Sequence, residues 1–101
     1  MISENIFDLD YRTTKPMVVL MPTYNHITFL KESIESILVQ DYNDFDFLIL
    51  DDGSTDNTWK VLQQYANLDK RIKLFRHRSN RGIPKSLNDL LILYYQNQKL
   101  N

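Results

Sequence analysis

Apolar and polar residues follow two different periods along the chain, and these periods predict its secondary structure. A continuous apolar run over residues 17–21, closed by Pro22, is typical of a strand buried on both faces. A second run covers residues 45–50 and ends in the turn-forming residues 51–54. Residues 72–76 alternate apolar with charged side chains, which indicates a shorter strand near a sheet edge.

Between these strands, apolar residues recur every three or four positions, which is the spacing of amphipathic helices. Helices are predicted over about residues 25–40, from about residue 56 with Ser54 or Thr55 as the cap, and over about residues 84–96. A strand followed by a helix thus occurs three times. This order predicts an α/β fold, a three-layer αβα arrangement with a Rossmann-like parallel sheet and right-handed crossovers.

Length and composition limit the number of domains and the classes of function that the chain can have. A chain of 101 residues is long enough for one small domain. We expect this domain over residues 16–101 and an N-terminal arm, residues 1–15, outside its core. Twelve basic against 13 acidic residues exclude a strongly basic nucleic-acid binder, and the absence of cysteine excludes thiolate chemistry. No apolar run approaches the roughly 20 residues that span a bilayer, and the N-terminus lacks a secretory pattern. A cytoplasmic location is therefore expected.

Three polar, turn-rich segments follow the three predicted strands, at residues 22–26, 51–55 and 77–82. The carboxyl ends of parallel strands lie at one edge of a sheet, where α/β folds bind their ligands. We therefore expect these loops to form one site. His26 and His77 are interpreted as lone loop histidines, because neither has partners at a spacing that indicates a hydrolase triad.

The first loop has a binding interpretation and a structural one. Pro22, Thr23, Tyr24 and Asn25 place an aromatic ring and hydrogen-bonding groups at a strand end. A tyrosine face can stack on a nucleic-acid base. Alternatively, the turn merely ends the strand, and Asn25 caps the following helix.

The second loop is also open to two interpretations. Asp51 and Asp52 can accept hydrogen bonds from an imide N–H or a ribose diol, but neighbouring strand residues point to opposite faces, so the two should not serve one ligand alike. Gly53 allows the backbone to pass close to a ligand. The alternative is a turn that caps the second helix. Seven basic residues and no acidic one lie between residues 70 and 85, and they form either a diphosphate contact or a solvated face.

Taken in order, the motifs resemble the N-terminal, nucleotide-binding half of a family 2 glycosyltransferase with the GT-A fold. They are Met21-Pro22-Thr23-Tyr24-Asn25, residues 36–42, residues 48–56, Asn80-Arg81-Gly82 and Ser86-Leu87-Asn88. The resemblance implies inverting glycosyl transfer from a nucleotide-diphosphate sugar, most often a UDP-sugar, to an unknown acceptor. It also implies a set of nucleotide-binding residues: Pro22, Thr23, Tyr24, Asn25, Asp51, Asp52, Gly53, Ser54 and Gly82. Asp52 would bond the base or the ribose.

The chain also departs from the family's pattern. In that family a fourth strand ends in an Asp-x-Asp motif that holds the metal, and a later acid is the base. Here the sequence stops before such a strand, and Asp44-Phe45-Asp46 precedes the second strand, at its amino end. We expect no catalytic residue, metal site or cofactor in this chain, and Mn or Mg only in a complete enzyme. The chain would be a fragment of a longer enzyme or a truncated gene product, catalytically incomplete alone.

The family's strand order, 3-2-1-4, would leave the strand at residues 17–21 as a bare edge. The third helix also carries more apolar residues than one stripe needs. These features predict a homodimer through that strand edge or helix, or a partner chain that supplies the missing half. As alternatives, the arm covers the same edge with Ile6, Phe7 and Leu9, or the chain is a non-catalytic interaction module. The complete enzyme would be cytoplasmic or peripheral to the membrane.

Overall fold

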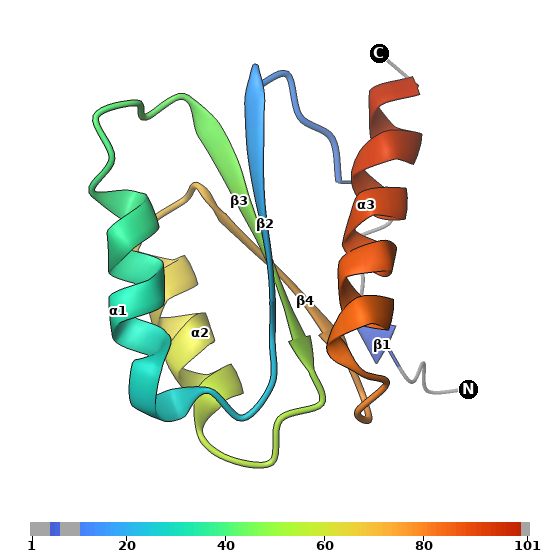
Figure 1. Cartoon of the computed structure of the whole chain (residues 1–101). Helices are drawn as coiled ribbons and strands as arrows, with labels where there is room; N and C mark the ends of the chain where they lie inside the picture. The colour runs from blue at the N-terminus through green and yellow to red at the C-terminus, as the bar shows by residue number, and fades with distance from the viewer. Residues whose placement is uncertain (1–4, 7–10, 100–101) are drawn as a thin grey trace.

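The computed structural model describes residues 5–6 and 11–99, which form a sheet between two layers of helices (Figure 1). Its strands are β1 (Asn5–Ile6), β2 (Met17–Thr23), β3 (Phe45–Asp52) and β4 (Ile72–His77). The spatial order is β1-β4-β3-β2, in which β2, β3 and β4 run parallel and β1 pairs antiparallel with β4. The predicted α/β fold and the order of the three long strands are confirmed.

Helices α1 (Ile27–Leu38) and α2 (Thr58–Leu68) cover one face of the sheet, and α3 (Ile83–Lys99) covers the other (Figure 1). The central strand β3 is buried along its whole length. Its odd-numbered residues, such as Phe47, pack against α1 and α2, while Leu48 and Leu50 pack on the α3 side. Alternate strand residues point to opposite faces, so cover on both faces explains why residues 47–50 are all apolar.

Part of the N-terminal segment belongs to the core. Tyr11 is 4% exposed, its hydroxyl donates to Asp46 at 2.9 Å, and its ring meets Phe75 edge-on. The expectation that residues 1–15 lie outside the core is therefore wrong for Tyr11. The suggested cover of the first long strand is also wrong for the described part, because β1 lies on the opposite edge, beside β4. Phe7 and Leu9 lie outside the described residues.

We expect Tyr11→Phe to lower the free energy of unfolding by about 1–3 kcal/mol, the usual cost of leaving a buried polar group without its partner. Asp46 is 6% exposed, so water does not readily replace the lost hydroxyl. Burial, and then the bond to Asp46, raise the pKa of Tyr11. Urea unfolding measures the effect, with Tyr42→Phe as the control because Tyr42 is 47% exposed. Equal losses in both variants would contradict the prediction.

The outer edge of β2 pairs with no strand among the described residues. Large apolar side chains are exposed on β2 and on the neighbouring α3, among them Met17, Leu87 and Leu91.

No helix within the described ranges is long and apolar enough to cross a bilayer.

Candidate functional site

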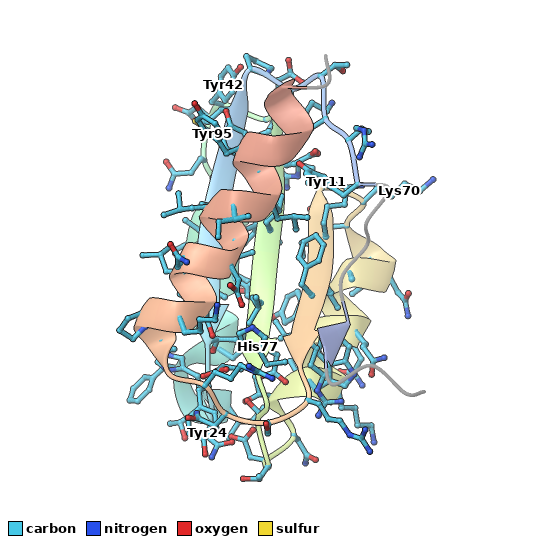
Figure 2. The ribbon with its side chains drawn as sticks, turned by 90° about the vertical axis from the view of Figure 1, so that its right-hand side faces the viewer. Tyr11, Tyr24, Tyr42, Lys70, His77 and Tyr95 are labelled. Carbon is cyan, nitrogen blue, oxygen red and sulfur yellow. The ribbon has the colours of Figure 1, made fainter. Side chains whose placement is uncertain are left out.

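The three long strands end side by side, and the loops that follow them meet at one end of the molecule. Thr23 pairs with Asp51 in the strand register, Asp51 with Arg76, and Asp52 with His77. Figure 2 shows Tyr24 and His77 toward this end, whereas Tyr42 lies at the opposite end. The predicted convergence of the three loops is confirmed.

Asn25 joins the first loop to the second. Its side-chain oxygen accepts from the backbone N–H groups of Thr55, at 2.8 Å, and Asp56, at 3.3 Å. Its own backbone N–H donates to the Ser54 hydroxyl at 2.8 Å. Asn25 has a φ of 47°, a left-handed conformation that asparagine tolerates better than most residues. The structural alternative for Asn25 is wrong, because the cap of α1 is His26, without a side-chain cap bond.

Ser54 is likewise part of the loop junction and not a helix cap. The cap of α2 is Asn57, so the predicted caps Ser54 and Thr55 are wrong. The Ser54 hydroxyl instead donates to the Asp51 carboxylate. Together with Asn25, Ser54 ties the first two loops to the end of β3.

Asp51 lies on the α2 side of the sheet and is fully buried. Burial raises the pKa of Asp51, against the Ser54 hydrogen bond and the charge of Arg76, which lower it. The Arg76 Nε lies 3.5 Å from Asp51 Oδ2, and the guanidinium stacks 4.9 Å from the centre of the Trp59 ring. Arg76 is therefore packed into the site and is not part of a solvated basic face.

Asp52 points to the opposite, α3 side and holds the third loop. Its Oδ1 accepts from the Arg81 backbone N–H at 2.9 Å, and its Oδ2 accepts from the Gly82 N–H at 2.7 Å. Like Asp51, it is fully buried. The sequence-based expectation that the two aspartates have different surroundings is confirmed.

His77 differs from its prediction as a lone loop histidine. It is the last residue of β4, it is fully buried, and its ring lies between two carboxylates. The Nδ1 is 2.7 Å from Asp52 Oδ1, and the Nε2 is 2.7 Å from Asp89 Oδ2. Reasoning from sequence missed Asp89, although its place beside Leu90 and Leu93 on the third helix puts it near the inward stripe.

The two glycines of the site have different surroundings. Both have a left-handed backbone, with φ of 73° at Gly53 and 97° at Gly82. A Cβ on Gly53 would lie 2.6 Å from the Ser79 carbonyl carbon, whereas one on Gly82 would meet nothing closer than Pro84 Cδ at 3.9 Å. The second loop therefore packs directly on the backbone of the third.

A pocket of about 370 Å³ opens beside the end of β2. Pro22, Thr23 and Tyr24 line it, together with Met21, His26, Ser33 and Ile83. Tyr24 is 38% exposed, and the buried Thr23 hydroxyl has no hydrogen-bond partner within the described residues. Asp51, Asp52 and Gly82 do not line this pocket, so the predicted site residues divide into pocket-lining groups and groups that hold the loops.

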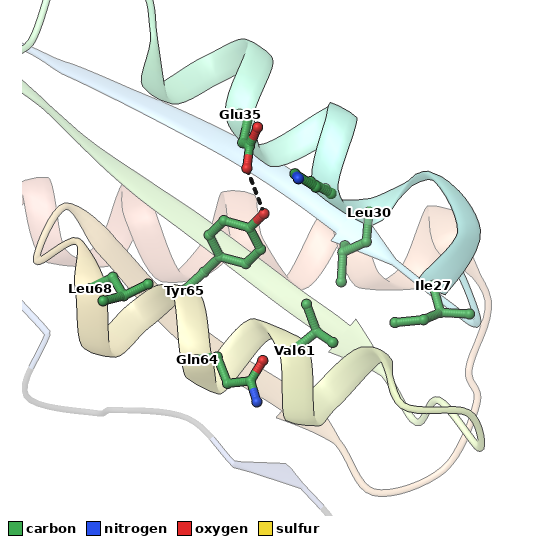
Figure 3. A pocket seen from close by; sticks show the side chains of 8 residues that line it. Ile27, Leu30, Glu35, Val61, Gln64, Tyr65 and Leu68 are labelled. Carbon is green, nitrogen blue, oxygen red and sulfur yellow. Dashed lines mark hydrogen bonds between the residues drawn. The ribbon is translucent and has the colours of Figure 1, made fainter.

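A second pocket, of about 470 Å³, lies between α1 and α2 (Figure 3). Leu30, Val61 and Leu68 provide much of its lining. The Tyr65 hydroxyl donates to Glu35 at 2.9 Å across it. It contains none of the predicted site residues.

The described residues do not fit a divalent metal. Within residues 5–6 and 11–99, no group of three or more His, Asp or Glu side chains could hold an ion. Asp46 is bonded to Tyr11, and the exposed Asp44 pairs with Lys15 at 3.1 Å.

Comparison with known proteins agrees with this geometry. Residues 18–91 match the family described as Glycosyl transferase family 2. A protein named as glycosyltransferase EpsE, from Bacillus subtilis (strain 168), is 43% identical over 74 residues, which are 72% of this chain and 27% of that protein. Glycosyltransferase GlyG from Streptococcus pneumoniae serotype 4 is 36% identical over 64 residues, 63% of this chain and 21% of that protein.

One solved structure with the same arrangement is the mannosyltransferase PcManGT from Pyrobaculum calidifontis in complex with GDP-Man and Mn²⁺. It superposes with a TM-score of 0.70 and 28% identity, over 84% of this chain and 25% of that chain. The chain thus spans about a quarter of the length of these relatives.

Proposed function

The chain belongs to glycosyltransferase family 2, and on that premise we propose that it binds a nucleotide-diphosphate sugar at the strand-end site, as the nucleotide-binding part of a glycosyltransferase. The observation that carries the proposal is the pocket beside β2. It combines an aromatic face, on Tyr24, with the unpartnered hydroxyl of Thr23, on a strand end that Asn25 fixes to its neighbour. These groups suit a flat, hydrogen-bonding ligand such as a base.

The site residues then take two kinds of role. Pro22, Thr23 and Tyr24 contact the nucleotide, while Asn25, Asp51, Gly53 and Ser54 give the loops their shape. Asp52 remains our candidate for the imide N–H or ribose. A carboxylate has about four lone-pair sites, and Arg81, Gly82 and His77 already occupy three of them. Because Asp52 is fully buried, this contact requires the third loop to shift.

We consider two nucleotides for the donor. A UDP-sugar is our first candidate, and the GDP-Man bound in the Pyrobaculum calidifontis structure makes a GDP-sugar the second. We assign the divalent metal, the catalytic base and the acceptor site to a complete enzyme and not to these residues. Transfer to the acceptor would then invert the sugar's anomeric configuration.

The test is a calorimetric titration of the chain with UDP and with GDP. We expect a dissociation constant in the high micromolar to millimolar range for at least one of them. Tyr24→Ala should weaken binding by about 1–3 kcal/mol, the usual worth of base–aromatic stacking. Tyr42→Ala is the matched control, because Tyr42 is exposed at the other end of the molecule. Binding of neither nucleotide, or unchanged binding by Tyr24→Ala, would overturn the proposal.

A second candidate function is a non-catalytic interaction module, favoured by the β2 edge and the exposed apolar side chains of α3. Leu87, Leu91 and Tyr95 are 40%, 47% and 63% exposed. We propose a homodimer through this surface, or a complex with a partner chain that carries the other parts of a glycosyltransferase. Sedimentation at micromolar concentration should show self-association that Leu91→Lys weakens. A chain that stays monomeric at every concentration would exclude the homodimer.

A further inference from the structure

A row of four ionisable side chains leads from the end of β3 to the surface of α3. It consists of Asp52, His77, Asp89 and Lys85, with successive contacts of 2.7, 2.7 and 3.0 Å. His77 and Asp52 are fully buried, the Asp89 side chain is 16% exposed, and the Lys85 side chain is 50% exposed. The row thus connects the interior of the site to the first turns of α3.

Each ring nitrogen of His77 faces one carboxylate oxygen. Carboxylate oxygens only accept hydrogen bonds, and a neutral imidazole carries a single N–H. Both ring nitrogens lie 2.7 Å from a carboxylate oxygen, so both contacts are hydrogen bonds when both nitrogens carry a proton. The ring is then a buried cation with an anion on either side, which is the arrangement that makes a buried charge tolerable.

Asp89 is suited to hold the ring from the helix side. Partial burial raises its pKa, but the hydrogen bonds from Lys85 and His77 outweigh this and keep the pKa of Asp89 below its usual value. The carboxylate is therefore the stable form. It lies in the second turn of α3, three residues after the buried Ser86, whose hydroxyl lies 3.4 Å from His77 Nδ1.

The other end of the row holds the third loop. Asp52 Oδ1 is shared between the ring and the Arg81 N–H, and Oδ2 accepts the Gly82 N–H. The imidazole thus helps to orient a carboxylate that ties this loop to β3. The Gly82 carbonyl then accepts from the Ser86 N–H at 3.0 Å, which continues the connection into α3.

We propose that His77 is a positioning residue of the nucleotide site, which acts with Asp89 to orient Asp52 and so to hold the Arg81–Gly82 loop at the strand ends. The effect on the loop is a property of this chain alone, while the effect on nucleotide affinity rests on the proposed function. His77 contacts no substrate. Its influence passes through Asp52.

The experiment compares His77→Leu, which lacks both donors, with His77→Asn, whose amide keeps one donor near the position of Nδ1. Amide hydrogen exchange by NMR reports the loop directly. We expect exchange at Arg81 and Gly82 to rise about tenfold or more in His77→Leu, with Leu48 in the sheet interior unchanged, and to be largely restored in His77→Asn. Lys60→Gln is the control, because Lys60 is exposed on α2, across the sheet from His77.

Two further measurements separate positioning from a general structural role. The wild-type ring should give two slowly exchanging N–H signals, one for each nitrogen. The affinity for UDP or GDP should fall about tenfold in His77→Leu and recover in His77→Asn. A single ring signal, unchanged exchange at Arg81 and Gly82, or unchanged affinity of a folded variant would overturn the inference. If His77→Leu does not fold, Asp89→Ala takes its place: faster exchange at Arg81 and Gly82 than in Lys60→Gln supports the inference, and exchange that matches Lys60→Gln overturns it.

The two proposals fail in different ways. A wild-type chain that binds neither UDP nor GDP overturns the proposed function, and exchange at Arg81 and Gly82 still decides whether His77 holds the loop. Normal nucleotide binding with unchanged exchange in the variants overturns only the role of His77.

Discussion

Gly53→Ala is expected to lower the free energy of unfolding by about 2–5 kcal/mol, enough to unfold a marginally stable domain of this size. Two costs add up. A side chain in the left-handed conformation at φ 73° costs about 1–2 kcal/mol. The new Cβ would also lie 2.6 Å from the Ser79 carbonyl carbon and 2.7 Å from the Asn80 nitrogen, and overpacking costs typically 1–3 kcal/mol.

The clash at Gly53 cannot be relieved cheaply, because the atoms it meets are backbone atoms. They belong to the loop that Asp52 holds through Arg81 and Gly82, so movement of the loop weakens those bonds. Gly82→Ala is the matched control. It shares the left-handed strain but has only Pro84 Cδ within 4 Å, so a loss of about 1–2 kcal/mol is expected. Equal losses in the two variants, measured by urea unfolding, would contradict the steric argument.

The long elements were predictable from sequence because their signals are local. The apolar run of β3 and the periodic residues of the helices report cover on their faces without reference to any distant residue. Tyr11 gives no such signal. Its burial depends on packing against Leu48, Leu50 and Phe75, and its hydroxyl bond reaches Asp46, 35 positions away, so neighbours in sequence do not reveal these contacts.

In the candidate site, too, features with a local sequence signal were predicted, and features that depend on distant residues were not. The loops were predicted because parallel strands place their carboxyl ends together, and the opposite surroundings of Asp51 and Asp52 follow from the period of a strand. The cap predicted at Ser54 and the alternative of a cap at Asn25 are both wrong, since capping is judged from neighbours in sequence while the partners of these residues lie in another loop or at the end of β3. His77 was missed because its role requires Asp89, on a helix whose register against the sheet is a tertiary property.

The two neighbouring aspartates should respond in opposite ways to substitution. Asp52→Ala removes the acceptor of two backbone N–H groups and one partner of the buried His77 ring. Breaking a buried charge pair on one side costs about 3–5 kcal/mol, so this variant should be among the least stable single variants of the chain.

Asp51→Asn should change stability little at neutral pH, or increase it. Burial raises the pKa of Asp51, so the folded protein favours its neutral form, and keeping it charged at pH 7 has a cost that the amide removes. That cost falls as the pH drops through the raised pKa. The difference between wild type and Asp51→Asn should therefore shrink or change sign between neutral and mildly acidic pH. The amide oxygen can still accept from the Ser54 hydroxyl.

Urea unfolding of Asp52→Ala and Asp51→Asn at pH 7 and at mildly acidic pH measures this contrast, and similar losses at Asp51 and Asp52 would contradict it. The structural role of Asp52 also affects the nucleotide titration of Asp52→Ala. Because Asp52 holds the Arg81–Gly82 loop, loss of UDP binding in Asp52→Ala does not identify a contact between this carboxylate and the base. Tyr24→Ala instead tests a contact between the Tyr24 ring and the base without disturbing that loop, since the exposed ring lines the pocket.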